Sequence, residues 1–188
     1  FIIEYNKFRS FKDRRYIVQN DMNFNPELLQ LRPSGNLHLS GYWQSEKYFK
    51  DIEHIIRNDL TIVPPTDDLN IRLGEKMSNY NSVAIHVRFF ESINNDNSSN
   101  VTNGYYENAI KEIQSRTNVD HYFIFSDDIE SAKILIDLNE KSTTFISHNK
   151  GDSGAYLDLW LMTKCKNFII ANSTFSWWGA WLSTNQEK

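Results

Sequence analysis

Apolar and polar positions alternate along this chain in two different rhythms. From about residue 79 onward, short apolar runs are separated by segments long enough to form helices. Such runs are typical of buried strands in α/β proteins, in which helices connect parallel strands. The predicted strands cover residues 83–87, 122–125, 143–146 and 168–171. We therefore expect an α/β domain with a parallel sheet over residues 79–188.

Between these runs, apolar residues recur at helical spacing. This spacing predicts helices over residues 105–116, 129–138 and 155–165. Residues 1–78 have a mixed pattern, with one helix predicted over residues 48–56 and another over residues 69–77. We expect residues 1–78 to form a separate, partial N-terminal region with connecting helices. Because the chain starts without Met and stops soon after a helical pattern begins, we also expect it to be part of something longer.

Composition narrows the class of protein. The 188 residues are 40% hydrophobic and 14% aromatic, and no apolar stretch has the roughly 20 residues of a membrane span. The formal net charge is −4 and no basic stripe is present, so a nucleic-acid partner is not expected. The lone Cys165 excludes an internal disulfide and a cysteine-based zinc site, which fits a reducing cytoplasm.

The first predicted strand carries a histidine and an arginine at its carboxyl end, where ligands bind in open α/β sheets. His86 and Arg88 are two residues apart and should project from the same face. Arginine offers a fork of donors that matches phosphate oxygens, and histidine can donate to a phosphate or ribose or act as a base. The alternative is a structural role, in which Arg88 pairs with a surface carboxylate and the hydrogen bonds of His86 are made within the protein.

Acidic residues follow the second predicted strand, in the segment Ser126, Asp127 and Asp128. Asp127 and Glu130 have the spacing of a helix capping box, which we favour over a role in recognising a donor-rich base or a sugar hydroxyl. We predict no metal site, because no further His or carboxylate lies nearby at ligand spacing.

One carboxylate, Asp158, stands within an otherwise apolar predicted helix. Burying a carboxylate without a partner is costly. Asp158 therefore either faces solvent or meets a ligand donor, such as the N–H groups of a guanine edge.

A polar turn follows the last predicted strand and leads into an aromatic helix. Its polar residues are Asn172, Ser173, Thr174 and Ser176. The free N–H groups at a helix start bind anions such as phosphate, although the same hydroxyls can merely cap the helix. We expect the nearby tryptophans to pack in the core; these are Trp160, Trp177, Trp178 and Trp181.

Near the N-terminus, a second aromatic segment mixes rings with polar side chains. Tyr42, Trp43, Gln44 and Glu46 suit a surface that grips a sugar, and core packing of the two rings is an equal alternative.

Five motifs in this order resemble the α-1,2-fucosyltransferases of glycosyltransferase family 11. They are the segment 41–49 (GYWQSEKYF), His86-x-Arg88, residues 125–128 (FSDD), residues 158–162 (DLWLM) and residues 172–180 (NSTFSWWGA). The resemblance spans nearly the whole chain. It implies a GT-B type, Rossmann-like architecture, here mostly the C-terminal donor-binding half with part of the acceptor-side N-terminal half. It further implies inverting transfer of fucose from GDP-fucose to a sugar hydroxyl, commonly a galactose 2-OH, without metal or cofactor.

The same resemblance assigns roles to residues of the proposed site. Arg88 resembles the arginine that grips the β-phosphate, His86 resembles its partner in donor binding, and Asp158 resembles the acid that contacts guanine. The turn at 173–176 resembles the pyrophosphate turn. Glu91 or Glu46 are candidates for a general base by residue type only.

The chain departs from the family pattern at one motif. That motif usually reads His-x-Arg-Arg-x-Asp, whereas Phe89 and Glu91 stand here in place of the second Arg and the Asp. The departure and the absence of the family's Gly-rich N-terminal segment favour an alternative, a GDP- or glycan-binding module or an inactive relative. Another nucleotide-sugar transferase is a further alternative. The expected partners are a nucleotide-sugar donor and an oligosaccharide acceptor, with peripheral association where that acceptor is membrane-bound.

Overall fold

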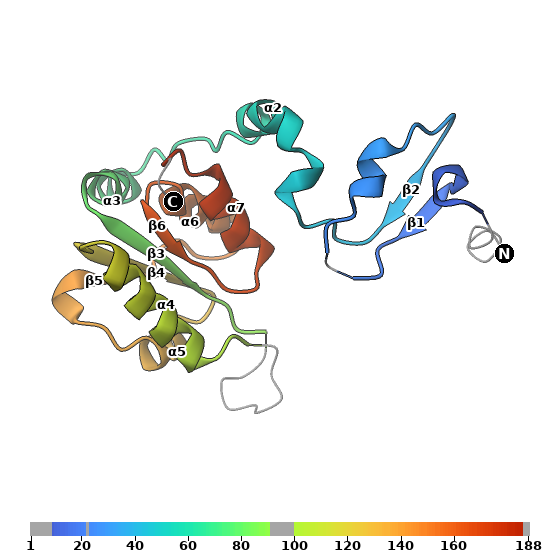
Figure 1. The fold of residues 1–188 in the computed structure, drawn as a ribbon. Coiled ribbons are helices and arrows are strands. Elements are labelled where there is room, and N and C mark those ends of the chain that lie inside the picture. The colour runs from blue at the N-terminus through green and yellow to red at the C-terminus, as the bar shows by residue number, and fades with distance from the viewer. Residues whose placement is uncertain (1–8, 22, 91–99, 186–188) are drawn as a thin grey trace. The chain divides into compact units, whose positions relative to one another are not determined.

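The computed structural model describes residues 9–21, 23–90 and 100–185. They divide into two compact units, with the boundary between residues 59 and 60 (Figure 1). The pattern analysis placed this boundary near residue 78. It falls earlier because the helix of residues 68–79 packs against the first strand and a later helix of the second unit.

The second unit is built on a four-stranded sheet in which every strand pairing is parallel. Its strands are β3 (Ser82–Val87), β4 (His121–Ser126), β5 (Thr143–Ile146) and β6 (Asn167–Ile169), in the spatial order β5-β4-β3-β6. Its helices are α3 (Asp68–Asn79), α4 (Asn103–Arg116), α5 (Ile129–Leu135), α6 (Ala155–Met162) and α7 (Thr174–Leu182), with 3-10 turns η5 (Glu140–Ser142) and η6 (Asp152–Gly154). The expected α/β class and parallel sheet are confirmed.

Alternation along the strands sends apolar side chains to both faces of this sheet. Val83, Ile85 and Val87 of β3 belong to one buried cluster together with residues of α4 and α5. Ala84 and Phe123 belong to a second cluster, which includes residues of α3, α6 and α7. The unit therefore has three layers with the sheet in the middle, and strands covered on both faces read as near-continuous apolar runs (Figure 1).

The order of the strands creates a switch point beside β3. The chain passes from β3 to β4 and β5 on one side, and then returns to place β6 on the other side of β3. In open α/β sheets, ligands bind beyond the carboxyl ends of the strands at such a point. The carboxyl ends of β3 and β6 are therefore where chemistry is expected.

Close contact between α3 and α6 depends on a glycine. A Cβ atom at Gly74 would lie 2.5 Å from Cζ3 of Trp160. We expect Gly74→Ala to destabilise the second unit by about 1–3 kcal/mol through overpacking, despite the better helix propensity of alanine. Urea unfolding would measure this, with Ser115→Ala on the exposed face of α4 as the control. A gain in stability for Gly74→Ala would contradict the packing seen here.

Trp181 and the single cysteine are buried in the second unit, as expected, whereas Trp160, Trp177 and Trp178 are only partly buried. Trp160 packs against the α3, α6 and α7 cluster, and Trp181 is buried in contact with Trp177 and Trp178. Cys165 is 1% exposed, and burial raises the pKa of its thiol to about 12. Among the described residues, no helix is both long and apolar enough to cross a membrane.

The first unit consists of short elements. Its strands β1 (Tyr16–Val18) and β2 (His38–Ser40) pair in parallel. Its 3-10 helices are η1 (Phe11–Asp13), η2 (Pro26–Gln30), η3 (Glu46–Tyr48) and η4 (Lys50–Ile52), and η4 leads into α2 (Glu53–Asp59). The continuous helix predicted over residues 48–56 is therefore wrong in its first half, because Phe49 has φ −135° and ψ 15° and interrupts the turns.

The ends of several helices and strands in the second unit differ by a few residues from the ends predicted from the sequence. α5 ends at Leu135, α6 ends at Met162, and β6 covers 167–169 instead of 168–171. Apolar residues continue past each of these ends because they still face the core. Ile136 and Cys165, for example, are both buried outside any helix.

Candidate functional site

Arg88 lies directly after β3, and its side chain pairs with a carboxylate that follows β4. Its Nη1 is 2.7 Å from Oδ2 of Asp127, and the other oxygen of that carboxylate accepts a hydrogen bond of 3.1 Å from the Phe89 amide. β3 and β4 are in register so that Val87 lies beside Ser126, which brings the next residues of both strands together. The pairing of Arg88 with a surface carboxylate, one of the two alternatives from the sequence, is what the structure contains.

This ion pair leaves much of the arginine fork for another anion. The side chains of Arg88 and Asp127 are 41% and 33% exposed, and such pairs contribute about 0–1 kcal/mol to stability. Nε and Nη2 of Arg88 make no hydrogen bond with the described residues, and the guanidinium carbon lies 5.4 Å from the ring centroid of Phe90. Asp127 and Phe90 therefore orient the guanidinium, and two donor positions stay open.

His86 is the last inward-facing residue of β3 on the side of α7. It is only 6% exposed, and its ring lies 5.7 Å from that of Phe175 in the first turn of α7. Burial, reinforced by the Arg88 charge and opposed by Asp127, lowers the pKa of His86 to about 4. The imidazole is therefore neutral at pH 7. A group with this pKa is a weak general base, so the environment favours binding or orientation over proton abstraction.

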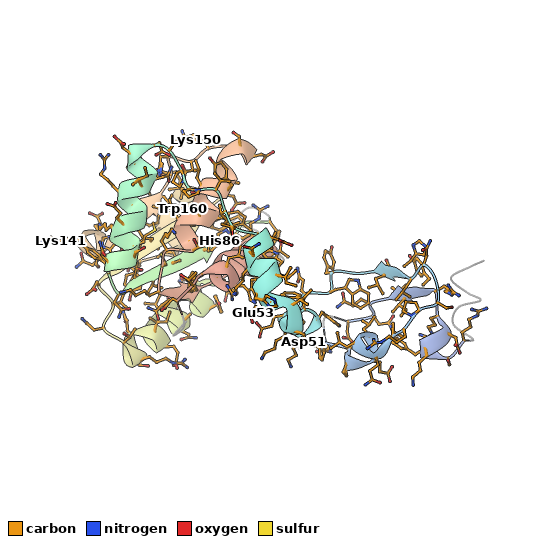
Figure 2. The ribbon with its side chains drawn as sticks, turned by 90° about the horizontal axis from the view of Figure 1, so that it is seen from above. Asp51, Glu53, His86, Lys141, Lys150 and Trp160 are labelled. Carbon is orange, nitrogen blue, oxygen red and sulfur yellow. The ribbon has the colours of Figure 1, made fainter. Side chains whose placement is uncertain are left out.

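The ring of His86 lacks a hydrogen-bond partner in the described part of the chain. Its Nδ1 is fully shielded from solvent and unsatisfied. Such a buried atom costs about 1–3 kcal/mol, and in native structures it calls for an explanation. Figure 2 shows His86 within the second unit, next to the elements that surround the sheet. A ligand group at the end of β3 would satisfy it only after a shift of the ring, because the atom is shielded in this structure.

The polar turn after β6 is the start of α7, as expected. Ser173 occupies the N-cap position, yet its side chain makes no capping hydrogen bond. Helix geometry leaves the first N–H groups without intrahelical partners, so the amides of this turn stay available to an anion. Thr174 is exposed. Ser176 differs from its neighbours, because its hydroxyl is buried and donates to the carbonyl of Ser173 at 3.1 Å.

Capping of α5 is performed by a different aspartate from the one predicted. Asp128 occupies the N-cap position, and its two oxygens accept from the amide and the hydroxyl of Ser131 at 3.1 and 2.6 Å. These hydrogen bonds lower the pKa of Asp128. Ser126 and Asp128 also bond to each other. The capping box predicted for Asp127 is therefore wrong by one residue, which leaves Asp127 for Arg88.

Asp158 on α6 is half-buried, and only one of its oxygens is held. Oδ1 accepts a hydrogen bond of 2.8 Å from Nδ2 of Asn149, and Oδ2 has no partner among the described residues. Burial raises the pKa of Asp158 to about 6, and the Asn149 hydrogen bond partly opposes this rise. The carboxylate thus presents one open acceptor in a partly desolvated place, which suits the N–H groups of a guanine edge.

The sequence analysis missed the amide network that supports Asp158. Asn70 at the start of α3 is 1% exposed and exchanges hydrogen bonds of 2.9 and 3.0 Å with Asn149. It also donates to Asp67 at 3.0 Å and lies 3.0 Å from Nε2 of His148. His148 and Asn149 lie in the loop after β5, which ends at Ile146. The polar residues after this third predicted strand could have revealed the network, because the ends of parallel strands share one edge of the sheet.

The structure thus places three predicted residues of the second unit, together with Asn149, which was not predicted, at the carboxyl edge of the sheet. Asn149 follows β5, Asp127 follows β4, Arg88 follows β3 and Asn172 follows β6. β5 and β3 are two strands apart, about 10 Å at the usual spacing. This separation suits one nucleoside diphosphate with its base near Asp158 and its phosphates near Arg88.

Other predicted residues lie elsewhere. Glu91 is outside the described residues. Tyr42 is 78% exposed, Gln44 and Glu46 are exposed, and Trp43 is half-buried, all in the first unit. In the described ranges, no three His, Cys, Asp or Glu side chains are grouped so as to hold a metal ion.

Comparisons with known proteins identify the family of this chain. The family model described as Glycosyl transferase family 11 matches residues 2–187. An alpha-1,2-colitosyltransferase from Escherichia coli is 34% identical over 155 residues, which are 79% of this chain and 52% of that protein. The O-antigen biosynthesis glycosyltransferase WbnK from Escherichia coli is 36% identical over 126 residues, which are 65% of this chain and 41% of that protein.

The chain therefore spans about half the length or less of these curated relatives. The family model, by contrast, covers nearly every residue of the chain, including the ends of all four strands of the second unit. This chain belongs to glycosyl transferase family 11.

Proposed function

We propose that this protein transfers fucose from GDP-fucose to a sugar hydroxyl, the 2-OH of a galactose, with inversion and without a metal ion. One observation carries the proposal. The open donors of Arg88, the unsatisfied imidazole of His86 and the uncapped start of α7 meet at the switch point of the sheet. These groups together suit a pyrophosphate.

Departure of GDP places growing negative charge on the β-phosphate. In the proposed reaction, Nε and Nη2 of Arg88 and the amides of residues 174–176 stabilise that charge in the transition state. Neutral His86 donates one ring N–H to the phosphate or ribose. Asp158 accepts from the guanine edge through its open oxygen and so selects guanine over bases without those N–H groups.

The acceptor hydroxyl attacks the sugar carbon from the face opposite the leaving GDP. Its proton requires a base, and Glu91 and Glu46 remain the candidates by residue type. Tyr42, Trp43, Gln44 and Glu46 remain the proposed acceptor-side residues. Asp127 is a poorer base, because its carboxylate is engaged by Arg88 and by the Phe89 amide.

Similarity to an alpha-1,2-colitosyltransferase favours a second candidate, in which the transferred sugar is colitose. The donor-site chemistry described above concerns GDP and does not separate the two sugars. Product analysis separates them. The protein is incubated with lactose or N-acetyllactosamine and either GDP-fucose or a GDP-linked colitose donor, and the products are identified by mass spectrometry.

We expect a product from one of these donors, unchanged by EDTA. We also expect GDP to raise the unfolding temperature of the second unit more than UDP or ADP does. GDP binding without any product would indicate a binding module instead of an enzyme. This is the alternative based on Phe89 and Glu91, where the chain departs from the family motif. Equal stabilisation by all three nucleotides would contradict the role given to Asp158.

A further inference from the structure

The first unit contains a cavity of about 260 Å³ beside β1. Its wall includes Gln19 just after β1, Phe24 and Asn25 before η2, and Trp43 before η3. This volume is below the range of about 300–1,000 Å³ typical of ligand pockets, so the cavity suits a small ligand. This cavity lies within a single unit and is separate from the groups at the end of β3.

Two hydrogen-bond donors on this wall have no partner in the described chain. They are Nε2 of Gln19 and Nε1 of Trp43, and both are shielded from solvent. The orientation of the Gln19 amide is fixed, because its Oε1 accepts from the backbone amides of Tyr42 and Trp43 at 2.9 and 3.0 Å. Each unsatisfied donor costs about 1–3 kcal/mol, which an entering acceptor atom would relieve.

The backbone beside these donors is strained. Trp43 has a φ of 51°, the only positive value among the described residues other than glycine. Gly41 has a φ of 150°, and a Cβ there would lie 2.5 Å from Cβ of Gln19. For residues other than glycine, such conformations cost about 1–3 kcal/mol, persist only when neighbours enforce them, and concentrate at functional sites. Here the two hydrogen bonds to Gln19 enforce them.

Rigid aromatic contacts hold the Trp43 ring in place. It meets the ring of Tyr48 edge-on, with centroids 6.0 Å apart, and Tyr48 lies 4.9 Å from Phe24. The hydroxyl of Tyr48 accepts a hydrogen bond of 2.8 Å from the Asn25 amide. The indole is therefore held in position before any ligand arrives.

The chemistry of the wall suits a neutral, hydroxyl-rich ligand. Aromatic rings pack on the C–H faces of sugars, and side-chain amides bond to their hydroxyls. One cation, Arg14, and one carboxylate, Asp21, lie on the wall and balance in charge. An anionic ligand would call for a surplus of donors with positive charge.

We propose that this cavity binds one pyranose unit of a glycan, and that small shifts of Gln19 and Trp43 on binding expose Nε2 and Nε1, which are shielded in the ligand-free structure, so that they donate to its oxygens. Naming that glycan as the acceptor rests on the proposed function, whereas the binding of a sugar here does not. In this assignment Trp43 keeps its place on the acceptor side, Gln19 joins it, and the exposed Tyr42 lies outside the cavity wall.

Nuclear magnetic resonance of the ¹⁵N-labelled protein tests this directly. D-galactose, L-fucose and lactose are titrated in turn, with acyclic D-mannitol as the control for unspecific effects. The Trp43 indole and Gln19 side-chain amide signals are assigned by their loss in Trp43→Phe and Gln19→Glu. We expect saturable shifts of both signals with at least one of the cyclic sugars and none with mannitol.

Gln19→Glu is the sharper variant, because it keeps the oxygen that holds the 42 and 43 amides and replaces the donor by a charged oxygen. We expect it to weaken sugar binding at least tenfold. Gln30→Glu on η2, an exposed site with the same change of charge, should bind as the wild type does. Wild-type signals that do not move with any cyclic sugar, or unchanged binding by Gln19→Glu, would overturn the proposal. If a variant fails to fold, the wild-type titration still decides.

The same sample separates this proposal from the proposed function. GDP is added and the signals of the second unit are followed. If the protein binds GDP and transfers the sugar but the Trp43 signal does not respond to sugars, only the proposed sugar-binding cavity is disproved. If the Trp43 signal responds to sugars but GDP does not bind, the sugar-binding cavity stands and the proposed transferase function is disproved.

Discussion

Replacing Arg88 by alanine is expected to lower kcat/KM for sugar transfer by roughly 30- to 1000-fold, equivalent to about 2–4 kcal/mol of transition-state stabilisation. The reason is that negative charge on the β-phosphate is larger in the transition state than in the bound donor. The loss in kcat/KM should therefore exceed the loss in GDP affinity. Initial rates with GDP-fucose or the colitose donor, together with calorimetric GDP binding, would measure both.

Stability should change little in this variant. The Arg88–Asp127 pair is exposed and contributes at most about 1 kcal/mol. Arg116→Ala, which breaks the exposed pair with Glu112 on α4, is a matched loss of charge away from the site. Arg88→Lys keeps the charge and loses the fork, and should fall between the wild type and the alanine variant. Transfer by Arg88→Ala within about threefold of the wild type would disprove the assignment.

Replacing Asp158 by asparagine is expected to stabilise the second unit at pH 7 while weakening GDP binding. The folded-state pKa of Asp158, about 6, exceeds its ordinary value of 3.8. The folded protein therefore binds more protons than the unfolded chain between these values, and stability falls as pH rises through this window. At pH 7 the buried charge costs on the order of 2 kcal/mol, allowing for partial solvation. The asparagine oxygen can still accept from Asn149.

Urea unfolding at pH 7.5 should show a larger free energy of unfolding for Asp158→Asn than for the wild type. This gain should be smaller at pH 4, because Asp158 of the wild type is then protonated. Calorimetry should show at least tenfold weaker GDP binding and a smaller preference for GDP over ADP. Asp137→Asn, an exposed carboxylate after α5, is the control and should alter neither. An Asp158→Asn protein that is less stable at pH 7.5, or binds GDP as before, would contradict this account.

The contribution of His86 to stability depends on pH in the opposite direction to that of Asp158, so each partly masks the other in the wild type. Its folded-state pKa of about 4 lies below the ordinary 6.5, so the unfolded chain binds more protons between these values. Stability from His86 is lost as pH falls through that window. Because the windows of Asp158 and His86 overlap, the two slopes partly cancel between about pH 4 and 6. Removing Asp158 should therefore make the second unit more sensitive to acid.

Much of the fold of the second unit was predictable from the sequence, because its strands are covered on both faces. β3 and β4 read as mostly apolar runs for this reason, and the predicted bounds of β5 agree with the structure to the residue. The first unit gave a weaker signal. Tyr48 and Ile52 have helical spacing, yet they lie in separate 3-10 turns because the non-helical backbone of Phe49, with φ −135° and ψ 15°, separates them.

The candidate site divides in the same way. His86, Arg88 and the 172–176 turn were predictable because each directly follows or ends a strand. Asn149 was not, since its importance depends on Asn70, which is 79 positions away. The choice between Asp127 and Asp128 as helix cap was also open in the sequence, because it depends on the neighbouring β3 and its arginine. Gln19 acts on a segment more than twenty residues later, which no local pattern reveals.

The buried Cys165 can report how fast the second unit opens. It is the single cysteine of the chain, and it sits between α6 and β6, where its thiol is shielded and un-ionised. Only the thiolate attacks disulfide reagents, so labelling waits for this region to open. The rate of labelling therefore measures the opening of the second unit alone and is independent of the state of residues 9–59. A bound nucleotide that contacts both β3 and α7 should slow the labelling of Cys165 in proportion to the fraction of protein that carries the nucleotide.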